Sequence, residues 1–228
     1  MFLVAGSSWA IPMSELNFDQ DYWTLTDLTT GLNGESTFTL TFEDASYESD
    51  FGLYTVDDVS DPKAISEKFM VFDKSKEPNT TIDGPTMQSV YFKKESGAWS
   101  VSLDSSDWTP FDSKFGFYFG VYTSGAQDQM VDYLWFTDTQ FNQLGNGSRQ
   151  DQYVEHIGTI WDGISNVKIY LDDKSGGGDR DFNDMVVVAN DLQPVPEPAT
   201  MLLLGVGLCG IAFVGRKKLI RHGWKVKG

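Results

Sequence analysis

Short runs of alternating apolar and polar residues fill most of the chain between residues 11 and 192. Phe38, Leu40 and Phe42 alternate with threonines, a pattern typical of a strand with one buried face. Similar runs predict strands near residues 69–71, 90–92, 99–103, 115–122, 133–136, 167–171 and 185–188. Turn-forming residues separate them, as at Ser96-Gly97 and Asn146-Gly147. We therefore expect about nine antiparallel strands in an all-β domain, either a β-sandwich or a jelly roll.

Two weaker features modify this picture. Helical periodicity is low throughout the body, and only residues 138–144 predict a short helix. The sequence Phe51-Gly52-Leu53-Tyr54 is echoed by Phe115-Gly116-Phe117-Tyr118. The echo is too short to indicate a duplication, so we interpret the two segments as similar core strands.

An acidic loop precedes the last predicted strand of the body. Three glycines at 176–178 allow the backbone to turn tightly there, and a calcium ion needs six to eight oxygen ligands. The predicted metal ligands are the acidic and amide side chains of this loop and of the preceding strand end: Asp172, Asp173, Asp179, Asp181, Asn183 and Asp184. The expected cofactor is Ca²⁺.

An alternative interpretation needs no metal. Asp and Asn side chains also form hydrogen-bonded turns, with Phe182 filling the core and Arg180 neutralising an acid. The loop does not have the EF-hand pattern, because Asp184 stands where that pattern requires glycine and a strand follows in place of a helix. Both interpretations stay open at this point.

Composition excludes several functions. The chain has 33 Asp and Glu against 17 Lys and Arg, and residues 1–198 hold all of the acids; such a body does not favour nucleic acid as a partner. The single cysteine, Cys209, excludes an internal disulfide, and His156 is the only histidine available to a nucleophilic site in the body. We expect no enzymatic activity, and we expect His156 to lie on the surface.

Tryptophans offer an alternative function, that of a carbohydrate-binding module. Trp99 and Trp135 lie within strand patterns, which favours core packing. Trp108 and Trp161 lie in loop-like contexts and are the better candidates for stacking on a sugar.

The C-terminal region predicts a membrane anchor. Residues 199–215 carry no charge, and a helix of that length spans about 25 Å, near the lower limit for crossing a bilayer. The basic cluster Arg216, Lys217 and Lys218 follows, which places residues 216–228 in the cytoplasm and the body on the opposite side. Residues 193–198, with three prolines, form an extended linker.

The linker, the apolar span and the basic cluster together resemble a known sorting signal. The tripeptide Pro196, Glu197 and Pro198, followed by residues 199–215 and then the basic cluster, is similar to the PEP-CTERM signal of Gram-negative bacteria. The resemblance implies processing by an exosortase, a membrane peptidase, at these three residues. It also implies anchoring in the inner membrane with the body in the periplasm, then transfer to the outer surface or to an exopolysaccharide or biofilm matrix. Ten residues follow the basic cluster, more than such tails usually have.

The body resembles a second family, through residues 178–186. Their sequence, Gly-Asp-Arg-Asp-Phe-Asn-Asp-Met-Val, is similar to the terminal signature of an uncharacterised bacterial extracellular domain family. That family has no assigned activity, and the resemblance implies calcium binding by the acidic signature.

The other end of the chain indicates export. Residues 1–10 are largely apolar, and Ser8 and Ala10 have the spacing of a cleavage site, so we interpret this segment as the remnant of a signal peptide. The expected organisation is a remnant at 1–10, a β-sandwich domain at 11–192, a linker at 193–198, a transmembrane helix at 199–215 and a basic tail at 216–228. The expected function is that of an exported, C-terminally sorted surface or matrix protein stabilised by calcium, whose partners are the exosortase, membrane lipid and possible exopolysaccharide.

Overall fold

A computed structural model describes residues 11–26, 34–43, 47–57, 65–73, 86–123, 131–144, 148, 151–177 and 180–196. The chain divides into two compact units, Met1–Pro194 and Val195–Gly228. The predicted transmembrane helix, the basic cluster, Glu197 and Pro198 lie outside the described residues. Within the described ranges, none of the helices has the length and apolar character needed to span a bilayer.

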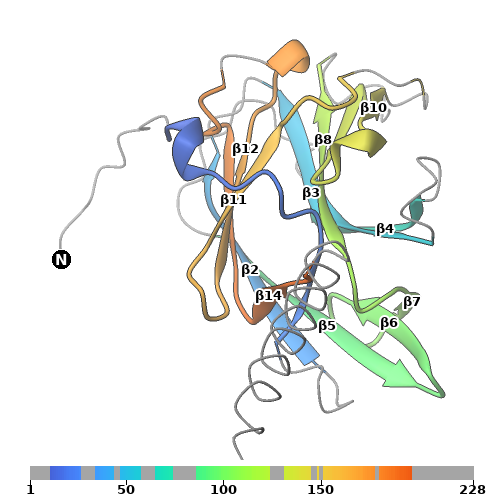
Figure 1. Cartoon of the computed structure of the whole chain (residues 1–228). Helices are drawn as coiled ribbons and strands as arrows, with labels where there is room; N and C mark the ends of the chain where they lie inside the picture. The colour runs from blue at the N-terminus through green and yellow to red at the C-terminus, as the bar shows by residue number, and fades with distance from the viewer. Residues whose placement is uncertain are drawn as a thin grey trace, which may run out of the picture. The chain divides into compact units, whose positions relative to one another are not determined.

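Strands dominate the first unit and form two large sheets and one small one, all with antiparallel pairing (Figure 1). The seven-stranded sheet has the order β11 (Ile157–Trp161), β12 (Val167–Leu171), β13 (Met185–Ala189), β2 (Gly34–Glu43), β5 (Thr86–Glu95), β6 (Ala98–Ser102) and β7 (Thr109–Pro110). The five-stranded sheet has the order β10 (Gln143–Leu144), β9 (Tyr133–Phe136), β8 (Gly116–Tyr122), β3 (Glu48–Val56) and β4 (Ile65–Asp73). Strand β1 (Trp23–Leu25) pairs with β14 (Leu192–Pro194).

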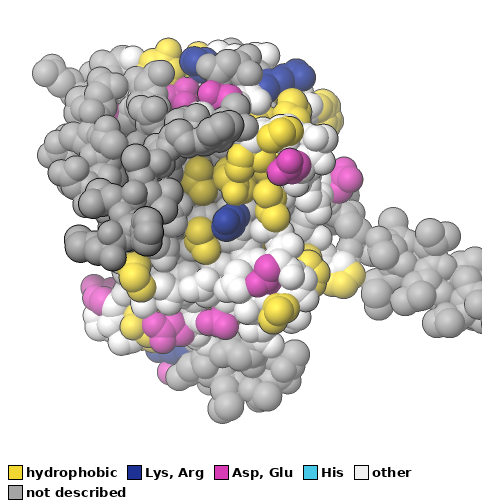
Figure 2. Space-filling model, turned by 90° about the vertical axis from the view of Figure 1, so that its left-hand side faces the viewer, with side chains coloured by type: hydrophobic (Ala, Val, Ile, Leu, Met, Phe, Trp, Pro, Cys, Tyr) yellow, Lys and Arg dark blue, Asp and Glu magenta, His cyan; other side chains and the backbone are white. Residues whose placement is uncertain are grey.

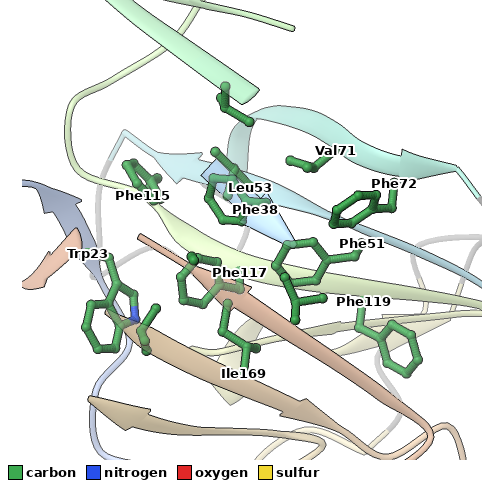
Figure 3. Packing of buried hydrophobic residues seen from close by; sticks show 14 of the residues in the cluster. Trp23, Phe38, Phe51, Leu53, Val71, Phe72, Phe115, Phe117, Phe119 and Ile169 are labelled. Carbon is green, nitrogen blue, oxygen red and sulfur yellow. The ribbon is translucent and has the colours of Figure 1, made fainter. Parts of the chain in front are cut away.

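The core lies between the two large sheets and is rich in aromatic rings (Figure 3). Phe38 of β2 packs on Phe51 of β3 and Phe117 of β8, with ring centroids 6.1 and 6.5 Å apart. Trp23 stacks on Phe117 at 5.9 Å and ties the small sheet to the same core. Phe38 and Leu40 are fully buried, as the alternating pattern predicts. The expected antiparallel all-β architecture is confirmed, and the facing sheets have the form of a sandwich.

The echoed tetrapeptides lie on adjacent strands and explain each other. Strands β3 and β8 pair so that Gly52 faces Tyr118 and Tyr54 faces Gly116. A methyl group on Gly116 would collide with the Tyr54 ring, and one on Gly52 would meet the Tyr118 ring and the carbonyl oxygen of Phe69. Each glycine therefore makes room for the tyrosine of the neighbouring strand.

The segment before β1 covers part of the outer side of the seven-stranded sheet. Asn17 exchanges backbone hydrogen bonds with Thr159 of β11, and Leu16 packs with Tyr170 and Phe182 in a second buried cluster. Figure 2 shows apolar side chains gathered on this side of the molecule, with charged side chains among and around them. Strand β11 is thus covered on both sides, and its sequence lacks the alternation that would have predicted it.

Short helical turns complete the fold. They are 3₁₀ turns at η1 (Met13–Glu15), η3 (Thr139–Phe141) and η4 (Ser175–Gly177). The helix expected at 138–144 is wrong in extent: η3 makes one turn, with the Asp138 side chain accepting the Gln140 N–H, and the chain then enters β10.

The glycine–tyrosine pairing generates a stability prediction. Gly52→Ala forces Cβ against a backbone carbonyl and the buried Tyr118 ring, and overpacking of this kind costs about 1–3 kcal/mol. Thermal unfolding should show a midpoint lowered by several degrees. Gly120→Ala, on β8, is the control. The atoms nearest to its Cβ would be a Val131 methyl group at 3.2 Å and Asp50 Cβ at 3.5 Å, so the contact is looser and a smaller loss of stability is expected. Equal losses in the two variants would contradict the proposed role of the tyrosine contact.

Candidate functional site

Three buried carboxylates meet at one end of the sandwich. Strand β12 ends at Leu171, which pairs with Met185, so the residues that follow β12 lie beside those that precede β13. Carboxylate oxygens of Asp172, Asp173 and Asp184 lie within 4.8 Å of one another, and all three residues are buried. We refer to these three residues as the acidic cluster.

Backbone N–H groups hold the acidic cluster in place. Asp184 Oδ2 accepts the N–H of Asp173 at 2.6 Å, and Asp172 accepts the N–H groups of Lys174 at 3.0 Å and Arg180 at 3.2 Å. Asp173 Oδ2 accepts the N–H of Tyr47 at 3.2 Å, just before β3. This last bond joins the loop that follows β12 of the seven-stranded sheet to the residue that precedes β3 of the five-stranded sheet.

Charge within the cluster is costly. Burial raises the pKa of Asp184 to about 8, and repulsion from Asp173 and Asp172 acts in the same direction, against the stabilising N–H of Asp173. Asp184 therefore carries a proton near neutral pH unless a cation neutralises the group. The arrangement has the chemistry of a hard-cation site, since carboxylate oxygens are the ligands that such ions prefer.

A turn of unusual backbone geometry leads into Asp184. Arg180 and Phe182 have φ values of 57° and 49°, in the left-handed region that residues other than glycine seldom adopt. Phe182 is fully buried and lies 5.2 Å from Phe18, ring centroid to ring centroid. Burial of the Phe182 ring anchors the turn, as the metal-free interpretation expects for this residue.

The predicted ligands are thus brought together in part. Asp172, Asp173 and Asp184 form the cluster, and Asp179 lies outside the described residues. Asp181 is half-buried and outside the group of three, although its charge contributes to the raised pKa of Asp184. Asn183 is also half-buried.

His156 adjoins the cluster, and its predicted surface position is wrong. Its side chain is fully buried and stacks on Trp135, with ring centroids 3.9 Å apart and an interplanar angle of 9°. Nδ1 lies 3.3 Å from the carbonyl oxygen of Asp172, and Nε2 lies 3.6 Å from Asp151 Oδ2. Burial lowers the pKa of His156 to about 4, against the opposing effect of Asp151, so the ring is neutral at pH 7.

A further buried acid begins the strand next to Tyr47. Glu48 is 3% exposed, and neither of its carboxylate oxygens has a hydrogen-bond partner within the described part of the chain. Asp50, two residues later, is also buried and accepts the hydroxyl of Tyr122. No local signal in the sequence distinguishes these buried acids from exposed ones.

The tryptophans considered for sugar binding are far apart. Trp161 ends β11 and is 40% exposed, whereas Trp108 precedes β7 and lies beneath the Lys93 ammonium, 4.2 Å from its ring centroid. Because β11 and β7 are opposite edges of the seven-stranded sheet, these two rings form no common platform. Trp135 is fully buried, as predicted, and Trp99 is half-buried.

Comparison with known proteins identifies the C-terminal segment. Residues 194–218 match the family described as the PEP-CTERM protein-sorting motif. The motif indicates an exported envelope protein that is sorted through its C-terminus, with an exosortase as its partner. The match covers a short part of the chain. The structure describes three of its residues, Pro194, Val195 and the exposed Pro196.

The body has no counterpart in these comparisons. No curated protein and no solved structure matches the chain. The suggested relationship to an uncharacterised extracellular domain family is not confirmed.

The stability of the folded state should depend on pH through Glu155, which precedes His156 in the sequence. Burial, then repulsion from Asp19 and Asp138, raises the pKa of Glu155 to about 7, from an ordinary value near 4.5. The folded state thus binds this proton more tightly than the unfolded state. The resulting stability is fully present below about pH 4.5 and is lost as the pH rises through about 7.

Glu155→Gln should remove that loss. Between pH 5 and pH 8.5, the unfolding midpoint of the variant should rise relative to wild type, measured by circular dichroism at each pH. Glu35→Gln, on an exposed position of β2, is the control and should follow the wild-type profile. Parallel profiles for Glu155→Gln and wild type would show that Glu155 is ionised throughout.

Proposed function

We propose that this protein is exported to the envelope of a Gram-negative bacterium, anchored in the inner membrane, and then released to the outer surface or matrix. The match to the sorting motif at residues 194–218 carries the proposal. In this scheme residues 199–215 contact membrane lipid, Arg216, Lys217 and Lys218 stay in the cytoplasm, and the exosortase recognises Pro196, Glu197 and Pro198.

A structural role in an exopolysaccharide or biofilm matrix is the second part of the proposal. The body is a sandwich with a continuous aromatic core, and its formal net charge with the tail is −16. The acidic cluster and His156 are buried and held by backbone groups, which suits a role in stability better than one in catalysis. We therefore assign no enzymatic activity.

Sorting can be tested with substitutions in the tripeptide. In native cells that contain the exosortase, wild-type protein should lose its C-terminal segment, seen as a reduced intact mass and release from the membrane fraction. Glu197→Ala should leave the protein full-length and membrane-bound. Asp191→Ala, a few residues earlier and outside the matched segment, should be processed normally. Processing of Glu197→Ala at the wild-type rate would exclude the tripeptide as the recognition element.

Calcium stabilisation of the body is the third part of the proposal. Three buried carboxylates within 4.8 Å of one another repel, and Asp184 shows the cost in its raised pKa. A divalent cation would offset that repulsion and join the loop before β13 to the start of β3, through Asp173 and Tyr47. Asp172, Asp173 and Asp184 would hold the ion, with Asp181 and Asn183 as neighbouring oxygen donors.

Thermal unfolding of the full chain in detergent tests this site. With calcium at about a hundred times its dissociation constant, the folded state gains about 2.7 kcal/mol, which should raise the wild-type midpoint by several degrees over chelator. Asp184→Asn should abolish the calcium shift and leave the protein folded in chelator, because the uncharged amide resembles the protonated carboxyl group that Asp184 carries when no cation is bound. The control, Asp191→Asn, alters an exposed acid beyond the far end of β13 and should keep the full shift.

An absence of any calcium effect on unfolding would favour the metal-free turn. A wild-type midpoint that is the same in calcium and in chelator contradicts the calcium site. The sorting proposal would be unaffected, because it rests on different residues.

A further inference from the structure

A cleft opens at the end of the sandwich away from the acidic cluster. Strand β3 begins beside Asp173 and ends at Val56, which lines this cleft with Ser66 and Glu67 of β4. The opposite wall comes from β6, β7 and the turns beside them, at Trp99 and Phe111. The cavity has a volume of about 640 Å³, within the range of about 300–1,000 Å³ typical of small-ligand sites.

Aromatic side chains line the cleft on the β6–β7 side. The N–H of Phe111 donates to the carbonyl oxygen of Trp99 at 3.0 Å, which fixes the two residues relative to each other. The Phe111 ring lies 6.2 Å from Phe69 and 6.3 Å from Phe92, so the core supports it from below. Trp99 is only half-buried and presents part of its indole to solvent.

Acidic and hydroxyl side chains line the same cleft as these rings. Asp57, Glu67 and Asp112 line the cleft and are exposed, and the described lining includes no lysine or arginine. The hydroxyls of Thr55 and Ser66 lie 2.9 Å apart on the β3–β4 wall. The cleft therefore combines an aromatic surface with several hydrogen-bond acceptors, three of which are carboxylates.

The Trp99 ring already receives a cation from its own strand pair. Lys94 pairs with Trp99 across β5 and β6, and its ammonium lies 5.4 Å from the ring centroid. A half-exposed indole in a cleft that carboxylates also line is well suited to an ammonium group, through cation–π attraction and charge-assisted hydrogen bonds.

We propose that this cleft binds a saccharide unit that carries a protonated amine. The half-exposed Trp99 ring would stack on the apolar side of a sugar ring, with the buried Phe111 behind it as support, while Asp57, Glu67 and Asp112 would accept hydrogen bonds from its ammonium and hydroxyl groups. The three carboxylates come from different parts of the lining, so they can accept hydrogen bonds from several positions of a sugar ring. A lysine side chain has all its donors on one atom and would use fewer of them. A sugar acid would be repelled by the carboxylates. None of these cleft residues belongs to the sorting motif or to the acidic cluster.

Calorimetric titration of the full chain in detergent at pH 5.5 is the test. The probes are a glucosamine hexamer, its fully N-acetylated counterpart of equal length, and a lysine trimer. We expect saturable binding of the glucosamine hexamer and binding at least about tenfold weaker for the acetylated hexamer, which lacks the charge. Glu67→Gln should weaken glucosamine binding about tenfold, since a hydrogen bond to a charged group contributes about 1.5–3 kcal/mol.

Matched variants separate binding from folding. Trp99→Ala should abolish binding, although it also changes a ring that packs on the core. Glu67→Gln alters an exposed side chain, so its loss of binding would not come from unfolding. Trp161→Ala, at the opposite edge of the seven-stranded sheet, should bind as wild type does. Equal affinity for the two hexamers, equal or tighter binding of the lysine trimer, or unchanged binding by Glu67→Gln would each overturn the proposal.

Discussion

Packing of aromatic rings between two antiparallel sheets is the interaction on which the rest of this structure depends. The ring centroid of Phe38 from one sheet lies 6.1 and 6.5 Å from those of Phe51 and Phe117 in the other, and Trp23 closes the same cluster from the small sheet. Apolar burial of this extent supplies the main favourable term in folding. It also fixes the two ends of the sandwich, where strands end and polar side chains can gather, so that β3 begins at the acidic cluster and ends at the cleft.

The two ends handle negative charge in different ways. At the cleft, Asp57, Glu67 and Asp112 remain exposed, so water screens them and they are available to a ligand. At the other end, Asp172, Asp173 and Asp184 are buried, and their charge has to be neutralised by a proton or by a cation. Burial and the neighbouring carboxylates raise the pKa of Asp184, which favours its protonated form when no cation is bound. The same carboxylate would lose that proton when an ion binds, so proton and cation compete for it.

Local patterns in the sequence predict the strands better than the sites. The alternation around Phe38 and Leu40 predicts a half-buried strand, because that signal needs only the residues of the strand itself. Strand β11 gives no such signal, since the segment at Leu16 covers its outer side, and the burial of His156 depends on Trp135, a residue of the other sheet. The pairing of Asp172 with Asp184 could be expected from their places at adjacent strand ends. The cleft could not, because Trp99 and Glu67 come to line one cavity only after the two sheets have packed.

The geometry of the acidic cluster bears on where such a protein would bind calcium. Within the described part of the chain, at least four of the six carboxylate oxygens of the cluster already accept backbone N–H groups, from Tyr47, Asp173, Lys174 and Arg180. Those bonds reduce the electron density that each oxygen offers to an ion, and a site with few ligands of its own binds calcium weakly. Extracellular calcium modules work with dissociation constants of about 10⁻⁴–10⁻³ M. A weak site would thus fill after export and not before, which makes the proposed cation site and the C-terminal sorting motif parts of one consistent account.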